Sequence, residues 1–240
     1  MARRYRDEWP VYISVGERNR KAQRAAAKLG DASPVIIQGF TIAKTFWGKS
    51  WCQNLERYSD YANRLPRGRT YVRSGCVVDL KIAPGTVHGL VSGSRVYTVT
   101  VNVAAIPKVR WKSVCQDCAG AIDSLVELLE GRFSKVTMER LCREKTGMFP
   151  FPAEMKFNCT CPDSARMCKH VAAVLYGIGA RFDEKPELLF TLRNVDRQDL
   201  ITKAGAHMTK TKVTKVLEAG GLSELFGIDI AEPKRKRRKS

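Results

Sequence analysis

Three cysteines and one histidine at close, regular spacing are the residues of this sequence best suited to chemistry. Cys159, Cys161, Cys168 and His170 form the pattern C-x-C, six residues, C-x-H. Three thiolates and one imidazole complete the coordination of four-coordinate zinc and leave no open position for water or substrate. We therefore predict one structural Zn²⁺ ion and no metal-activated hydrolysis. The alternatives are a redox pair at the C-x-C and buried cysteines beside a helix histidine.

The two halves of this pattern require two different local structures. In an extended segment, residues i and i+2 project to the same side, so Cys159 and Cys161 can reach one ion before Pro162 turns the chain away. Cys168 and His170 stand just before and within the first turn of an apolar helix predicted over about 167–178. The N-terminal dipole of that helix favours thiolates. The end of a strand and the start of a helix therefore supply the four ligands of one tetrahedral site.

The pattern resembles the SWIM zinc finger, and the similarity extends beyond the finger. Residues 40–103, with 44–51 and 58–69 inside them, and residues 131–133 resemble prokaryotic SWIM zinc finger proteins of about this length. The resemblance implies the same four zinc ligands and a target that is DNA or a partner protein. It also implies that the protein works with helicase-like remodelling ATPases. It implies no particular molecular activity.

Charge indicates the class of partner. Lys and Arg number 42 against 24 Asp and Glu, which gives a formal charge of +18 over 240 residues. This excess favours anionic partners, most often nucleic acid, and DNA is the form that the resemblance favours. Without the six basic residues of the C-terminal run the formal charge is still +12, so the rest of the chain is basic too. The run consists of Lys234, Arg235, Lys236, Arg237, Arg238 and Lys239.

Further candidate nucleic-acid contacts lie inside the chain. Four arginines cluster near Tyr58, Tyr61 and Tyr71, a mixture that suits phosphate contacts and base stacking, or else a solvated face whose tyrosines are core residues. These arginines are Arg64, Arg67, Arg69 and Arg73, and Arg166 and Lys169 add charge from the finger. The C-terminal run is interpreted as a nonspecific nucleic-acid arm in a bacterium, or as a nuclear address in a eukaryote.

The remaining cysteines and histidines carry weaker signals. Cys115 and Cys118 have C-x2-C spacing, which is compatible with half of a second zinc site, a thioredoxin-like pair or helix packing. The sequence has no matching C-x2-C or H-x3-H pair downstream, and this favours helix packing. His88 and His207 are interpreted as surface residues.

The periodicity of apolar residues predicts an α+β fold. A helix is expected over about 48–64, ended by Pro66-Arg-Gly68, and a strand over 72–82. Strands at 87–91 and 95–103 then complete an antiparallel meander. Helical patterns follow near 122–129 and 133–141, and polar helical segments near 184–193, 196–204 and 213–219.

Breaks in composition predict four segments. Residues 1–38 form a basic flexible arm, and 39–150 an α+β domain with a helix, a three-stranded meander and further helices. The Pro150-Phe-Pro152 sequence marks a boundary. Residues 151–226 hold the SWIM finger, with ββα-like geometry and C-terminal helices, and 227–240 form a disordered basic tail.

The sequence predicts a binding protein and no enzyme. Phosphate-loop, H-E-x-x-H, G-x-S-x-G and paired-carboxylate motifs are missing, and no apolar stretch approaches a membrane span. We expect a cytoplasmic or nucleoid-associated protein with no small-molecule substrate. The first hypothesis is a zinc-binding nucleic-acid accessory protein that works with a helicase-like ATPase. The alternative is a protein-interaction adaptor in which the finger docks a partner and the basic residues do not form a nucleic-acid site.

Overall fold

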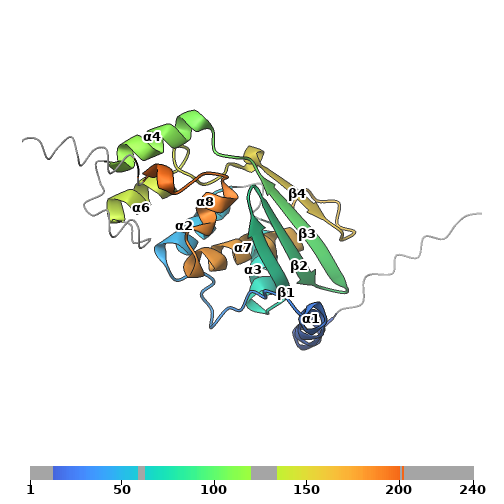
Figure 1. Cartoon of the computed structure of the whole chain (residues 1–240). Helices are drawn as coiled ribbons and strands as arrows, with labels where there is room; N and C mark the ends of the chain where they lie inside the picture. The colour runs from blue at the N-terminus through green and yellow to red at the C-terminus, as the bar shows by residue number, and fades with distance from the viewer. Residues whose placement is uncertain (1–12, 59–62, 120–133, 201, 203–240) are drawn as a thin grey trace, which may run out of the picture.

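A four-stranded antiparallel sheet with the strand order β1-β2-β3-β4 lies at the centre of the structure. It was obtained as a computed structural model that describes residues 13–58, 63–119, 134–200 and 202. The strands are β1 (Val77–Ala83), β2 (Thr86–Ser92), β3 (Val96–Val103) and β4 (Met155–Cys159). With its flanking helices, the sheet confirms the α+β class and the meander (Figure 1). The fourth strand pairs Cys159 with Val99 of β3.

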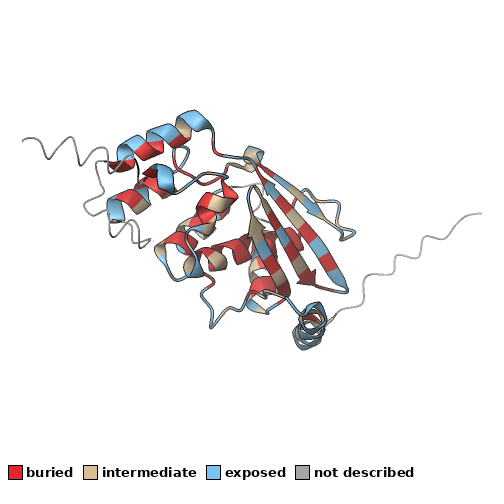
Figure 2. Cartoon of the chain, viewed as in Figure 1, coloured by how far each residue is buried: buried red, intermediate tan, exposed pale blue. Residues whose placement is uncertain are grey.

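One face of the sheet is buried and the other is largely exposed. Along β3, Tyr97, Val99, Val101 and Val103 are buried and alternate with more exposed neighbours, as a half-buried strand requires (Figure 2). The buried face packs on α7 (Lys169–Glu184), the helix that follows the finger. Almost every residue of α7 from His170 to Phe182 is buried, so this helix is the core of the fold.

Two shorter helices reach α7 at glycines. A Cβ atom on Gly68 of α3 (Leu65–Arg73) would lie 2.4 Å from the Cβ of Ala172. A Cβ atom on Gly48 of α2 (Phe46–Glu56) would lie 2.5 Å from the carbonyl oxygen of Gly179. The missing side chains let the helix backbones approach closely. The α2–α7 contact also carries a hydrogen bond of 2.8 Å from the Trp51 indole N–H to the Leu175 carbonyl.

The prediction for 48–82 was wrong in two places. The helix ends at Glu56, and Pro66 and Gly68, expected to stop it, lie in the first turn of α3. Proline is favoured there because its missing N–H would have no partner at the start of a helix. The expected strand from 72 begins only at Val77, because Val72 belongs to the buried face of α3.

The described part of residues 1–38 also differs from the expected flexible arm. Helix α1 (Val15–Leu29) begins at Ser14, whose side chain caps the Glu17 N–H at 3.2 Å, and it packs on β1 and β2 through Ala22. The next segment runs along β1, where the Val35 N–H donates to the Val77 carbonyl at 3.0 Å. The segment is folded because small alanine side chains allow α1 to lie close to the sheet.

The finger does not form a unit separate from residues 39–150. Strand β4 pairs with β3, α7 packs on α2 and α3, and one continuous hydrophobic core runs from Val35 to Leu200. The boundary expected at Pro150-Phe-Pro152 is therefore a bend within one folded body. None of the described helices is long and apolar enough to cross a membrane.

The remaining helices lie at the end of the molecule opposite α1 (Figure 1). They are α4 (Lys108–Ala119), α6 (Lys135–Cys142), the short 3-10 helix η2 (Pro152–Glu154) and α8 (Leu188–Leu192). Helix α6 confirms the prediction near 133–141, whereas α4 was not predicted. Helix α7 extends beyond the expected end at 178, and α8 is shorter than its predicted segment. The helices expected at 122–129 and 213–219 lie outside the described residues.

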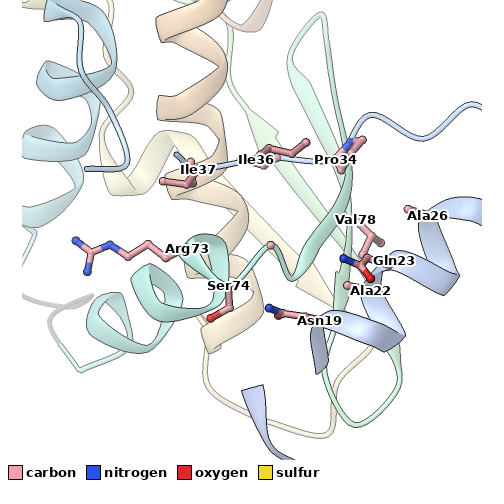
Figure 3. Close-up of a pocket in the computed structure, with 12 residues that line it drawn as sticks. Asn19, Ala22, Gln23, Ala26, Pro34, Ile36, Ile37, Arg73, Ser74 and Val78 are labelled. Atoms are coloured by element: carbon pink, nitrogen blue, oxygen red, sulfur yellow. The ribbon is translucent and has the colours of Figure 1, made fainter. Parts of the chain in front are cut away.

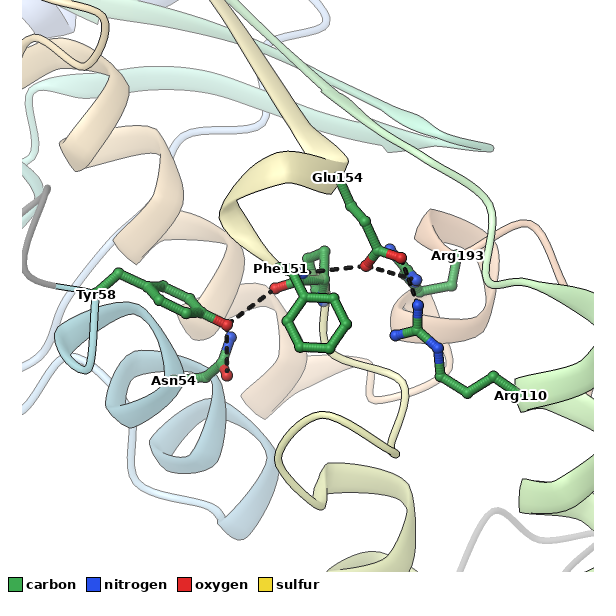
Figure 4. Close-up of polar contacts among 7 residues, drawn as sticks. Asn54, Tyr58, Arg110, Phe151, Glu154 and Arg193 are labelled. Carbon is green, nitrogen blue, oxygen red and sulfur yellow. Dashed lines mark hydrogen bonds and ion pairs between the residues drawn. The ribbon is translucent and has the colours of Figure 1, made fainter.

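A buried ionic network anchors the start of β4 (Figure 4). Glu154 accepts a hydrogen bond from Arg193 at 3.1 Å and from Arg110 at 2.5 Å, and it also accepts the Phe151 N–H at 3.0 Å. Arg193 is fully buried, and burial lowers the pKa of its guanidinium. Nearby, the Tyr58 hydroxyl donates to the Pro150 carbonyl at 3.4 Å. These contacts fix the segment that leads into the ligand-bearing strand.

We expect the substitution Glu154→Gln to lower the free energy of unfolding by about 3 kcal/mol, because it leaves the buried Arg193 charge without its counterion. Urea denaturation measures the change. The double variant Glu154→Gln/Arg193→Met should recover part of the loss, and Glu187→Gln, at an exposed position, should change stability by less than about 0.5 kcal/mol. A Glu154→Gln protein as stable as the unsubstituted chain would contradict this role of the network.

Candidate zinc centre and the basic surface beside it

The four predicted ligands converge on one point. Cys159 ends β4, Cys161 follows in the turn, Cys168 is the N-cap of α7 and His170 lies in the first turn of that helix. Their ligand atoms all lie within 4.8 Å of one another. The Nδ1 atom of His170 is 3.8 Å from the sulfurs of both Cys159 and Cys168. Tetrahedral zinc with its usual bond lengths separates neighbouring ligand atoms by about 3.6–3.8 Å, so the donor set and spacing fit one zinc ion.

The thiols of the cluster differ in acidity. Hydrogen bonds from Cys159, His170 and the Val171 backbone N–H lower the pKa of Cys168 to about 3. The hydrogen bond to Cys168 and burial raise the pKa of Cys159, and burial raises that of Cys161. Cys168, at the start of the helix, is therefore the thiol most ready to bind as thiolate, as the helix dipole predicts. Zinc binding displaces the protons of the other two.

Contacts around the cluster hold its loop in place. The Thr98 N–H donates to the Thr160 hydroxyl at 3.0 Å and the Thr160 N–H donates to the Thr98 carbonyl at 3.1 Å, which extends the β3–β4 pairing past Cys159. Asp163 accepts the Ala165 N–H at 3.1 Å and forms an ion pair with Arg64 at 3.4 Å. The turn between the two ligand pairs is thereby tied to both the sheet and α3.

His170 is enclosed by two aromatic rings. The Tyr97 ring stacks on the imidazole at a centroid distance of 4.4 Å, and the Tyr71 ring meets it edge-on at 5.4 Å. The imidazole is 3% exposed. Tyr97 lies on the strand that pairs with β4, so its role depends on tertiary structure and sequence reasoning did not identify it.

The predicted arginines of 64–73 divide into two groups. Arg64 pairs with Asp163 of the finger, and Arg69 is bonded to Glu56 and to the Tyr176 hydroxyl, which ties α3 to α2 and α7. Arg67 and Arg73 remain exposed. Two of the four arginines therefore have internal partners.

The two predicted basic residues of the finger also differ. Arg166 is exposed and donates to the Pro152 carbonyl at 3.4 Å. The Lys169 ammonium lies 5.3 Å from the centre of the Tyr71 ring, directly beside the zinc cluster. The basic run 234–239 lies outside the described residues.

A basic surface that the sequence did not reveal lies beside the zinc ligands. A pocket of about 390 Å³ is bordered by His170, Lys169, Tyr71 and Tyr97, and by Arg18 of α1. A neighbouring hollow of about 260 Å³ lies between α1 and the β2–β3 turn. We call the cations of these two sites the α1-turn surface; they are Arg18, Lys21, Arg24, Lys28, Arg95 and Lys169. The signal available in the sequence was the series of basic residues along 18–28.

Another hollow, of about 370 Å³, lies on the other side of α1 (Figure 3). Its lining is mostly apolar and includes Ala22, Val35 and Ile37. Arg73 borders it with the guanidinium directed away from α1 (Figure 3). This hollow contains no group of metal ligands and is separate from the zinc centre.

The second cysteine pair is part of the core. Cys115 and Cys118 are both fully buried on α4, and burial raises the pKa of the Cys118 thiol to about 11. Within the described residues, the zinc cluster is the one group in which three or more such ligands converge. The structure therefore favours helix packing for this pair.

We expect Cys161→Ala to abolish stoichiometric zinc binding and to lower the melting temperature by about 10 °C, because zinc affinity contributes directly to folding. Zinc per chain is measured by atomic emission and melting by calorimetry. The control is Cys52→Ala, at a partly buried cysteine outside the cluster, which should retain one zinc ion. Full zinc content in the Cys161→Ala protein would show that the cluster is not the site.

Comparisons with known proteins agree with this geometry. The family model of the SWIM zinc finger, in general a non-catalytic binding module, matches residues 149–177. The chain is 34% identical over 168 residues to the uncharacterized protein Rv2102 of Mycobacterium tuberculosis, an alignment that covers 69% of this chain and 60% of that protein. No solved structure matches the chain. Residues 149–177 are therefore a SWIM zinc finger, which binds one structural zinc ion through Cys159, Cys161, Cys168 and His170.

Proposed function

We propose that this protein is a non-catalytic accessory factor that binds nucleic acid, with DNA as the favoured form, through the surface beside its zinc finger. The observation that supports this function best is the gathering of six cations on the α1-turn surface. They come from α1, the β2–β3 turn and the start of α7, which are far apart in the sequence. Cations that converge from separate elements form the type of surface that neutralises phosphates.

Few acidic groups of the described chain oppose this surface. Glu17 forms an ion pair with Lys21 at 3.3 Å, and Asp163 at the edge of the pocket is already paired with Arg64. Arg24, Lys28 and Arg95 are exposed, and none of them forms an ion pair with a described carboxylate. The surface therefore keeps most of its positive charge for a partner.

The zinc ion has a structural role in this proposal. The three thiolates and the imidazole fill the four positions of the ion, so zinc orders the loop and the start of α7 and takes no substrate. In the sequence Lys169 lies between the ligands Cys168 and His170, and its neighbour Tyr71 of α3 packs edge-on against the His170 ring. Zinc thereby fixes the direction of the cations that contact phosphate.

A protein partner is the second candidate function. Phe40 is 86% exposed and Ile36 is 72% exposed on one connecting segment, an arrangement that suits docking to another protein. The helicase-like ATPase that the family resemblance implies would be such a partner, held by this segment while the finger side holds DNA. Co-purification of an ATPase that survives nuclease treatment and is lost in Phe40→Ser would support this; co-purification that nuclease abolishes would count against it.

We expect DNA binding by the folded body to fall steeply with salt. The test uses the full chain with the six basic residues of 234–239 changed to glutamine, titrated with labelled DNA at about 50 mM and 200 mM salt. Contacts to about three phosphates of a duplex would weaken binding about 40-fold across this range. Binding that is the same at both salt concentrations, or that disappears with the tail charges, would contradict the proposed surface.

A further inference from the structure

The pocket beside the zinc centre contains donor groups that have no acceptors. Because Nδ1 of His170 faces the sulfurs, the Nε2 atom of the metal-bound imidazole carries a proton and is a donor. Nε2 is buried and has no hydrogen-bond partner in the described part of the chain. A zinc-bound histidine almost always donates this N–H to a carboxylate, a carbonyl or water. The acceptor of this N–H therefore comes from a water molecule or a ligand group in the pocket.

Arg18, which also lines the pocket, shows the same deficit. Its Nε atom is buried and has no acceptor among the described residues, and its guanidinium carbon lies 4.8 Å from the centre of the Tyr71 ring. Lys169 approaches the same ring at 5.3 Å and forms no ion pair with a described residue. Two cations and one buried N–H donor therefore surround a single space.

Two polar side chains that line the pocket are engaged within the chain. The Oδ1 atom of Asp163 accepts from the Ala165 N–H and pairs with Arg64, and the Tyr97 hydroxyl lies 2.5 Å from the Ser94 hydroxyl. Neither hydrogen bonds to His170 or Arg18. An anion that enters the pocket from outside the chain would satisfy these donors and balance the charge of the two cations.

We propose that this pocket holds one phosphate group of a single-stranded nucleic acid, bound by Arg18, Lys169 and the Nε2–H of His170. Phosphate offers several acceptor oxygens and a charge that two cations match. A pocket of about 390 Å³ admits a single nucleotide unit, whereas a duplex presents its phosphates on a convex ridge. The buried Tyr71 and Tyr97 rings form the walls that hold the donors in place, because Arg18 and Lys169 lie over the Tyr71 ring and Tyr97 stacks on His170.

This inference rests on the proposed nucleic-acid function and makes it more specific. The α1-turn surface by itself would bind any polyanion in proportion to its charge. A pocket with three converging donors adds a preference for a strand whose phosphate can enter. The neighbouring hollow with Lys21, Arg24 and Arg95 then continues the path of the strand along α1.

The test compares two double variants of the full chain that remove the same charge. Arg18→Gln/Lys169→Gln alters the pocket. Arg20→Gln/Lys185→Gln alters an exposed position of α1 and the exposed residue that follows α7. For a labelled oligothymidylate, we expect the pocket variant to raise the Kd about tenfold and to lower the salt slope by about 0.7, the value for one phosphate of a single strand. The surface control should change the Kd by less than about twofold. One zinc ion per chain in both variants confirms that the finger is intact.

The outcomes separate the pocket from the wider function. If both variants weaken oligothymidylate binding equally, the pocket is not a phosphate site, and nucleic acid binds through the overall charge of the surface. Failure of the unsubstituted chain to bind any oligonucleotide at low salt would overturn the proposed function as well. Competition arms use inorganic phosphate, thymidine monophosphate and duplex DNA of the same length. Free phosphate, thymidine monophosphate or duplex that displaces the labelled strand as effectively as unlabelled oligothymidylate does, at equal phosphate concentration, would overturn the single-stranded ligand.

A direct readout on His170 avoids any substitution of a zinc ligand. In the zinc-loaded chain labelled with ¹⁵N-histidine, the Nε2 resonance reports the hydrogen bond that this N–H donates. We expect it to shift on addition of the oligothymidylate, and to stay unchanged in the Arg18→Gln/Lys169→Gln variant. An Nε2 resonance that is unchanged while the unsubstituted chain is saturated would overturn His170 as a phosphate donor.

Discussion

The zinc tetrahedron is the connection on which the rest of this structure depends. It joins the end of the edge strand β4 to the start of α7, the helix against which the sheet, α2 and α3 all pack. A metal that closes this junction fixes the direction in which α7 leaves the sheet, so the finger belongs to the core of the molecule. The buried Glu154–Arg193 pair performs a similar task at the other end of β4. Both ends of a five-residue strand are thereby anchored.

The same junction arranges the surface beside it. His170 presents one nitrogen to the metal and the other toward the pocket, so the coordination bond sets the position of a donor on the outer side of the ring. Tyr71 and Tyr97 pack on this ring, and Arg18 and Lys169 lie against Tyr71. Metal, aromatic rings and cations therefore form consecutive layers. Zinc contributes to the proposed binding function by holding these layers in place, without contacting the ligand.

The parts predicted from the sequence were those in which the information is local. The four ligands lie within twelve residues, and the strands of the meander follow one another through short turns, so spacing alone was sufficient. Gly68 was misread because its role is set by the packing of α3 on α7, and Pro66 because it starts α3 and does not end α2. The pocket residues Arg18 and Tyr97 belong to different elements from the finger, and only the fold brings them to His170. Arg69 was predicted to contact phosphate, but its guanidinium is paired with Glu56 and hydrogen-bonded to the Tyr176 hydroxyl of the same chain.

Hydrogen exchange measured by mass spectrometry on the zinc-loaded full chain, with and without single-stranded DNA, tests most directly where nucleic acid binds. We expect DNA to slow exchange in α1, in the β2–β3 turn at 92–96 and in the first turn of α7, which border the α1-turn surface. Slower exchange confined to residues outside the folded body, or no change on addition of saturating DNA, would contradict it.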